Sequence, residues 1–145
     1  MFYANSNIDT AGEFARRLDS ARRLADADGV ELVAAPYDHG EWLREVARGF
    51  EGEPEKGMRC LRCFRYNLEK TARHAAEHGF DAFTTSLTVS PHKPSAAVFA
   101  ASGDAAFLKE DFKKRGGFAR SVARAAELGL YRQSYCGCEF SRRDG

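Results

Sequence analysis

Two closely spaced pairs of cysteines carry most of the chemistry that this sequence could perform. One pair is Cys60 and Cys63, the other is Cys136 and Cys138, and the 145-residue chain has no further cysteine. Thiolates bind zinc and iron–sulfur clusters, and two neighbouring thiols can also cycle between dithiol and disulfide. The spacing therefore predicts a metal site, a redox site or both.

The first pair lies where a helix is expected to begin. Cys60 and Cys63 are three residues apart, so both sulfurs point to the same side of the first turns. The free amides of a helix N-terminus favour a thiolate over a thiol, and Arg59, Arg62 and Arg65 add positive charge nearby. We predict metal or redox chemistry for this pair; two small buried hydrophobic residues are the alternative.

The second pair forms a Cys-x-Cys motif near the C-terminus. Gly137 separates the two thiols and gives the backbone the freedom that a small, strained ring needs. Strained disulfides are readily reduced, which suits electron exchange. Cys136 and Cys138 could equally ligate a metal, and one structural zinc site built from all four thiols is an alternative that the spacing leaves open.

Three aromatic or polar side chains precede this motif. Tyr131, Arg132 and Gln133 combine stacking, positive charge and an amide, which are the groups that recognise unpaired RNA bases. We therefore predict that they contact a nucleic acid. The earlier basic pair Arg16 and Arg17, by contrast, has the spacing of an ordinary solvated helix face.

Length and composition are those of a single globular domain spanning residues 1–145. Hydrophobic residues make up 43% of the chain and charged residues 30%, with a net charge of +1. No apolar run approaches the roughly 20 residues needed to cross a bilayer. No secretory signal is visible, so we expect a cytoplasmic protein without membrane contacts, in a compartment where thiols stay reduced.

Helical and strand patterns alternate along the chain. Apolar periodicity predicts long helices over residues 10–29, 60–79 and 117–129, and shorter ones near 42–49 and 96–101. Short strands are predicted at 2–3, 30–35 and 81–87. This order predicts an α/β, Rossmann-like (HUP-like) domain with a mainly parallel sheet covered by helices. The chain opens in the middle of an element, so we expect an initial βα unit to be missing.

Three sequence blocks, at 59–72, 83–91 and 131–141, resemble one family in their content and order. They carry the Cys-x-x-Cys motif, a Phe-Thr-Thr-Ser-Leu segment followed by Ser-Pro, and the Tyr-Arg-Gln-x-Tyr-Cys-Gly-Cys tail. The family is the cobalamin-independent epoxyqueuosine reductases, which act on tRNA. The resemblance extends over essentially the whole chain.

The resemblance implies an enzyme that completes queuosine synthesis. The epoxide on the cyclopentane ring of a modified guanosine in a tRNA anticodon is reduced to the alkene, with electrons from a donor that the sequence does not identify. A 4Fe–4S cluster, rather than cobalamin, serves this family. By the resemblance, Cys60 and Cys63 are cluster ligands, while Cys136 and Cys138 are a redox-active pair.

The resemblance also implies that the tail holds the anticodon loop through Tyr131, Arg132 and Gln133. Members of the family carry an N-terminal strand that ends in adjacent cysteines, which look like further cluster ligands. This chain starts after that point, and two thiolates are half of the usual set for such a cluster. We expect a chain that is N-terminally truncated relative to the family, whose missing segment supplies the remaining ligands.

Other interpretations stay open at this point. The tail cysteines could complete the ligand set, or the protein could be an inactive relative. A zinc-bound RNA-binding module without catalytic activity, or a thiol–disulfide oxidoreductase that uses only Cys136 and Cys138, would also fit the four thiols.

Overall fold

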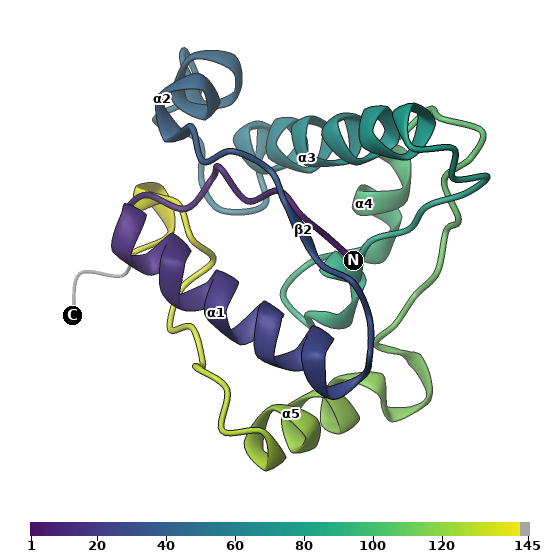
Figure 1. The fold of residues 1–145 in the computed structure, drawn as a ribbon. Coiled ribbons are helices and arrows are strands. Elements are labelled where there is room, and N and C mark those ends of the chain that lie inside the picture. The colour runs from purple at the N-terminus through teal and green to yellow at the C-terminus, as the bar shows by residue number, and fades with distance from the viewer. Residues whose placement is uncertain (143–145) are drawn as a thin grey trace.

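The computed structural model describes residues 1–142 of the chain. Short strands and five α-helices follow one another around a small sheet (Figure 1). In chain order the elements are β1 (Phe2–Tyr3), α1 (Ala11–Ala27), β2 (Val33–Ala34), α2 (His39–Trp42), a π-helical turn (Leu43–Ala47), α3 (Met58–Glu77), a 3₁₀ turn (Ser86–Val89), α4 (Ser95–Ala100), a 3₁₀ turn (Lys114–Gly116), α5 (Gly117–Glu127) and a 3₁₀ turn (Glu139–Ser141). No helix within these 142 residues combines the length and the apolar character needed to span a membrane.

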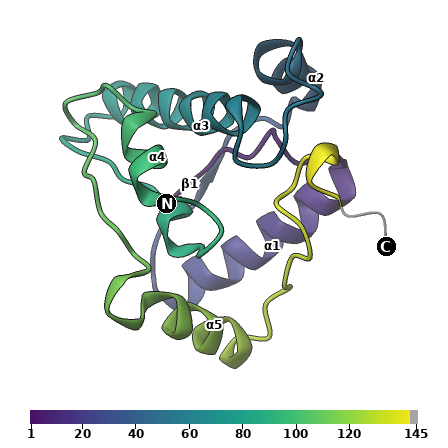
Figure 2. The same ribbon diagram turned by 180° about the vertical axis from the view of Figure 1, so that it is seen from behind.

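The sheet consists of β1 and β2, which run parallel and are joined by α1. Its register pairs Phe2 with Val33 and Tyr3 with Ala34. The predicted second strand, 30–35, is thus confirmed only at Val33 and Ala34, in its C-terminal half. The strands lie between α1 and α3 (Figures 1 and 2), and α1 is the helical crossover that a parallel pair requires.

Successive residues of β1 point to opposite sides, as in any strand. The ring of Phe2 stacks on His74 of α3 at a centroid distance of 4.1 Å. Tyr3 meets Phe14 of α1 edge-on at 5.2 Å and is itself buried. The two-residue strand therefore holds the two longest helices on either side of the sheet.

The third predicted strand, 81–87, is largely wrong. Only Phe83 forms a parallel bridge, to Phe107. The hydroxyl of Thr85 then accepts a hydrogen bond from the backbone N–H of Leu87 at 3.2 Å, which turns the chain into the 3₁₀ turn. The fold is α/β with a small two-stranded sheet, and the expected alternation of strand and helix does not continue through the second half.

The predicted helices are confirmed, with one change of type. The side chain of Thr10 caps α1 by accepting the N–H of Glu13 at 3.1 Å, and Gly29 follows the helix in the left-handed conformation. The helix predicted near 42–49 is instead the single turn α2 followed by the π-helical turn.

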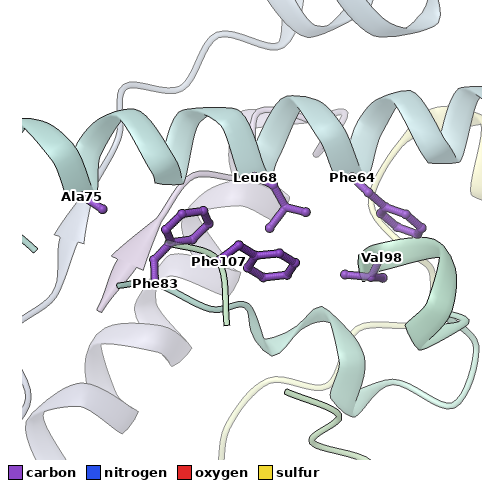
Figure 3. Packing of buried hydrophobic residues seen from close by; sticks show 6 residues of the cluster. All are labelled: Phe64, Leu68, Ala75, Phe83, Val98 and Phe107. Atoms are coloured by element: carbon purple, nitrogen blue, oxygen red, sulfur yellow. The ribbon is translucent and has the colours of Figure 1, made fainter. Parts of the chain in front are cut away.

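One face of α3 forms the main hydrophobic core, shown in Figure 3. The six buried side chains of this cluster are Phe64, Leu68, Ala75, Phe83, Val98 and Phe107. Burying a large apolar side chain contributes about 1.5–3 kcal/mol. Because α3 is fixed in this way over most of its length, its first turns provide a rigid base for Cys60 and Cys63.

Candidate redox and metal site

The C-terminal tail returns along α1 after α5 ends (Figures 1 and 2). The backbone N–H of Tyr131 donates to the hydroxyl of Ser20 at 3.1 Å, on α1. Further on, the hydroxyl of Tyr135 donates to the carboxylate of Asp9 at 2.6 Å. These contacts bring the Cys-x-Cys motif from the end of the chain to the start of α1.

Arg17 of α1 fixes the backbone on the N-terminal side of this motif. Its guanidinium donates to the carbonyl oxygens of Cys136 at 2.8 Å and Tyr135 at 3.1 Å. It also pairs at 2.7 Å with the carboxylate of Glu13, which is buried. The interpretation of a solvated face is right for Arg16, whose side chain is 63% exposed, and wrong for Arg17, at 10%. The buried Glu13 carboxylate draws Arg17 inward.

Gly137 is required by the way the tail crosses the start of α1. Its φ of 145° lies in the region that side chains rarely adopt. A Cβ atom at this position would lie 3.0 Å from the side-chain amide nitrogen of Asn7 and 3.3 Å from the side chain of Ile8. The Gly137 carbonyl accepts the backbone N–H of Asp9 at 2.9 Å, so the tail cannot move away without losing this bond.

Replacement of Gly137 by alanine is therefore expected to displace both cysteines. Backbone strain and the close approach should lower the free energy of unfolding by about 1–3 kcal/mol, and Cys138 should become accessible to thiol reagents. Urea unfolding and alkylation followed by mass spectrometry measure the two effects. Gly103→Ala is the matched control, because its Cβ would meet no atom within 4 Å. Unchanged stability and alkylation in Gly137→Ala would show that the tail does not need this backbone conformation.

The structure brings the two cysteine pairs together. Cys138 is buried in an apolar cluster with Trp42, Val46 and Ala47, and Cys63 packs against the same cluster. Cys136, by contrast, is exposed, and all four cysteines are free thiols. One pair therefore contains an accessible thiol and a buried one, beside the pair on α3.

Cys60 and Cys63 each have a hydrogen-bond donor at the sulfur. The backbone N–H of Lys56 donates to Cys60 at 3.3 Å, and the side-chain amide of Asn67 donates to Cys63 at 3.5 Å. The indole N–H of Trp42 is buried in the cluster beside Cys63 without a hydrogen-bond partner. A buried, unpaired donor costs free energy that a thiolate acceptor would recover, so these donors fit a pair of thiolate ligands.

The neighbouring arginines Arg59, Arg62 and Arg65 bind backbone carbonyls and a carboxylate rather than these sulfurs. Arg59 is buried and donates to the carbonyl oxygens of three residues of the preceding loop, with its guanidinium 4.3 Å from the ring of Phe140. Arg62 binds two backbone carbonyls, and Arg65 pairs with Glu69. Arg59 is still near enough to Cys138 for its charge to oppose the rise in the pKa of that thiol, which burial causes.

The prediction that the helix start favours a thiolate is wrong for Cys63 in the metal-free protein. Burial raises the pKa of Cys63 to about 12. The proximity of Trp42 lowers this pKa, while the charges of Cys136, Cys138 and Cys60 raise it further. The four thiols thus form one electrostatic group, and a metal that bound Cys63 would have to displace its proton.

This raised pKa predicts a loss of stability at alkaline pH. The folded protein holds the Cys63 proton more tightly than the unfolded chain, so the contribution is fully present below pH 9.0 and is lost as the pH rises toward about 12. Relative to Cys63→Ala, the free energy of unfolding of the metal-free wild-type protein should fall by at most about 1.4 kcal/mol per pH unit in this window. Urea titrations from pH 8 upward measure it. A difference between the two proteins that does not change with pH would contradict the burial of this thiol.

The described residues do not form a complete metal site. Within residues 1–142, no three His, Cys, Asp or Glu side chains converge closely enough to hold a metal ion. The thiols as placed therefore do not form the four-ligand set of a structural zinc site. Cys60 and Cys63 offer two thiolates on one helix face, and the chemistry of this pair suits half of the ligand set of an iron–sulfur cluster.

The residues predicted to contact nucleic acid lie at the surface just before the motif. Arg132 and Gln133 are exposed. Tyr131 is 41% exposed. Its hydroxyl donates to Glu13 at 3.0 Å, and the centre of its ring lies 5.3 Å from the guanidinium of Arg16. Part of the Tyr131 side chain is therefore open to solvent, but its hydroxyl is already hydrogen-bonded to Glu13.

Sequence reasoning missed three residues of the site. Arg17 and Trp42 contribute the contacts described above, and the ammonium of Lys93 lies 3.6 Å from the sulfur of Cys136. For Lys93 the available signal is its position just after the Ser-Pro of the second family block, in the loop Ser-Pro-His-Lys-Pro. Nothing in the local pattern singles out Arg17.

Comparison with known proteins gives one consistent result. The family model described as "Epoxyqueuosine reductase QueH" matches residues 1–144. The chain is 39% identical to the epoxyqueuosine reductase QueH of Streptococcus pyogenes, over 99% of this chain and 60% of that protein. It is 34% identical to QueH of Haemophilus influenzae, over 99% and 61% of the two chains, and 34% identical to QueH of Dehalococcoides mccartyi, over 97% and 77%. The chain thus spans about three fifths of the length of the first two relatives. The protein belongs to the epoxyqueuosine reductase QueH family.

Proposed function

We propose that this protein reduces the epoxide of epoxyqueuosine in tRNA to the alkene of queuosine. The membership of the chain in the QueH family supports this reaction. The observation that carries the proposal is the position of the tail, which holds one exposed and one buried thiol beside the cysteine pair of α3. The relatives are named for this activity, and in this proposal Cys136 and Cys138 are the thiols that supply its electrons.

Two electrons and two protons balance the reaction, because the epoxide oxygen leaves as water and a carbon–carbon double bond remains. Oxidation of Cys136 and Cys138 to a disulfide releases two electrons and two protons. Gly137 provides the backbone freedom for such a small ring. An external electron donor then supplies two electrons, which together with two protons return the pair to the dithiol.

We further propose that a 4Fe–4S cluster, without cobalamin, is held by Cys60 and Cys63, with its remaining ligands supplied by a segment that this chain does not contain. Such a cluster would pass electrons one at a time. The side-chain amide of Asn67 and the indole N–H of Trp42 would hydrogen-bond to the ligand sulfur of Cys63 and hold it in place. In the same proposal, the two-stranded sheet is part of a wider, Rossmann-like (HUP-like) sheet.

The tRNA anticodon loop would lie against the exposed part of the tail. Arg132 and Gln133 are free to approach a phosphate or a base edge, and the ring of Tyr131 offers a stacking face. Replacing Arg132 with alanine should weaken tRNA binding about 10-fold, since a stacked base is worth roughly 1–3 kcal/mol. A filter-binding titration at fixed salt measures it. Arg73→Ala, an exposed arginine in the last turns of α3, is the control. Equal affinity of both variants and wild type would remove Arg132 from the interface.

The reaction itself is tested with tRNA that carries epoxyqueuosine. Protein purified without oxygen is incubated with this tRNA and dithionite, and the nucleosides are separated and identified by mass spectrometry. Conversion to queuosine by the wild type, and its loss in Cys136→Ser, would support the proposal. No conversion, together with one tightly held zinc ion and intact tRNA binding, would favour a non-catalytic RNA-binding module instead.

A further inference from the structure

Lys93 reaches Cys136 from a distant part of the sequence. Its ammonium nitrogen lies 3.6 Å from the Cys136 sulfur, although 43 positions separate the two residues. Lys93 belongs to the loop that joins the 3₁₀ turn Ser86–Val89 to α4 and is half-buried. It places a proton-bearing cation next to the accessible thiol of the pair.

The backbone around Lys93 is fixed from two directions. Its carbonyl accepts a hydrogen bond from the ammonium of Lys113 at 3.2 Å, and its own N–H donates to the carbonyl of Ser90 at 3.3 Å. Lys113 is held in turn by the carboxylate of Asp111 at 3.4 Å and by the hydroxyl of Ser95. The loop therefore presents Lys93 at a defined place.

The backbone around Cys136 is fixed as well, because Arg17 binds the two carbonyls that precede Gly137. The contact between the Lys93 ammonium and the Cys136 sulfur thus joins two segments whose backbones are both fixed by hydrogen bonds. The hydrogen bonds that fix the backbone of Lys93 involve no cysteine. The position of Lys93 therefore does not depend on its contact with Cys136.

We propose that Lys93 is the acid that protonates the epoxide oxygen when Cys136 attacks the ring. The inference rests on the proposed function. In this step the sulfur forms a bond to one epoxide carbon, the carbon–oxygen bond breaks, its electron pair goes to oxygen, and a proton passes from the Lys93 ammonium to that oxygen. Water returns a proton to Lys93 afterwards. An ammonium donates up to three hydrogen bonds and can give up a proton, whereas the guanidinium of Arg17 cannot be deprotonated in a protein.

The test compares two reagents that attack the same sulfur. A small neutral epoxide needs a proton at oxygen when it reacts, and iodoacetamide releases iodide, which needs none. The whole chain, wild type or Lys93→Met, is treated with each reagent, and the rate at Cys136 is followed by peptide mass spectrometry with the site assigned by fragmentation. The ratio of the two rates cancels any change in the fraction of thiolate or in exposure.

In Lys93→Met, the epoxide rate should fall roughly 100-fold more than the iodoacetamide rate, which is the lower end of the range for general acid catalysis. Lys93→Arg keeps the charge but not the transferable proton, so it should lose most of the same ratio. Lys109→Met, at an exposed lysine, is the matched control and should keep the wild-type ratio.

An equal fall for both reagents, or no fall, would overturn the role of Lys93 as an acid. This measurement needs no tRNA, so it separates the inference from the proposed function. A selective loss with the small epoxide, in a protein that never converts epoxyqueuosine in tRNA, would keep the acid–thiol pair and remove the proposed substrate.

Discussion

Replacing Cys60 with alanine, in a protein that also carries the segment with the remaining cluster ligands, is expected to remove most of the iron and acid-labile sulfide after purification without oxygen. Cys60 and Cys63 are the two thiols on the rigid first turns of α3, and four thiolates are the usual ligand set of such a cluster. The Lys56 N–H that now meets the Cys60 sulfur would lose its acceptor. Iron, sulfide and zinc are measured on the same samples, because only iron and sulfide together report a cluster.

Cys136→Ala is the matched control for this experiment. Cys136 is exposed and lies beside Lys93, not within the donor set of Asn67 and Trp42, so this variant should keep its iron and sulfide. Full loss in Cys136→Ala would make the tail a source of cluster ligands and end the proposed division between a metal pair and a redox pair. One zinc ion in place of iron and sulfide in the wild type would favour the zinc-bound module.

Short-range features of the fold could be predicted from the sequence. The N-cap at Thr10, the apolar periodicity of α3 and α5, and the glycine after α1 depend on neighbouring residues, and all appear in the structure. The extent of the sheet could not be predicted in the same way. A run such as 81–87 is compatible with a strand, but pairing needs a partner of equal length, and here only Phe107 bridges to it.

The candidate site shows the same division. The cysteines stand out in the sequence by their spacing, since few roles besides metal binding and redox chemistry require thiols in two closely spaced pairs. Arg17 does not, because its partners are a buried carboxylate on its own helix and carbonyl oxygens more than 100 positions away. The pKa of Cys63 was missed for a related reason. Sequence shows the helix start and its positive charges, whereas burial, which outweighs them, depends on Trp42 and the tail.

Replacing Cys138 with serine is expected to stop turnover without stopping the attack by Cys136. Cys136 is exposed and lies next to Lys93, while Cys138 is 8% exposed within the Trp42 cluster. In the proposed mechanism the accessible thiol attacks the epoxide first, and its buried neighbour then attacks at sulfur, so that a disulfide forms and the carbon–sulfur bond of the adduct breaks. The electron pair of that bond forms the alkene as hydroxide leaves and takes up the second proton. Without Cys138 this second step has no nucleophile, so queuosine formation should fall by about 10³-fold or more, as for other members of a catalytic unit.

The distinguishing result is a covalent complex between Cys138→Ser and tRNA that carries epoxyqueuosine. We expect it as a band of reduced mobility in a denaturing gel and as a modified Cys136 peptide after nuclease digestion. Cys136→Ser should form no such complex, because the buried Cys138 cannot reach a bulky substrate. Ser134→Ala, an exposed residue of the same tail, should behave as wild type. If Cys138→Ser were inactive and formed no adduct, while Cys136→Ser did form one, the two thiols would have the opposite roles, and the contact between Lys93 and Cys136 would belong to the second step rather than the first.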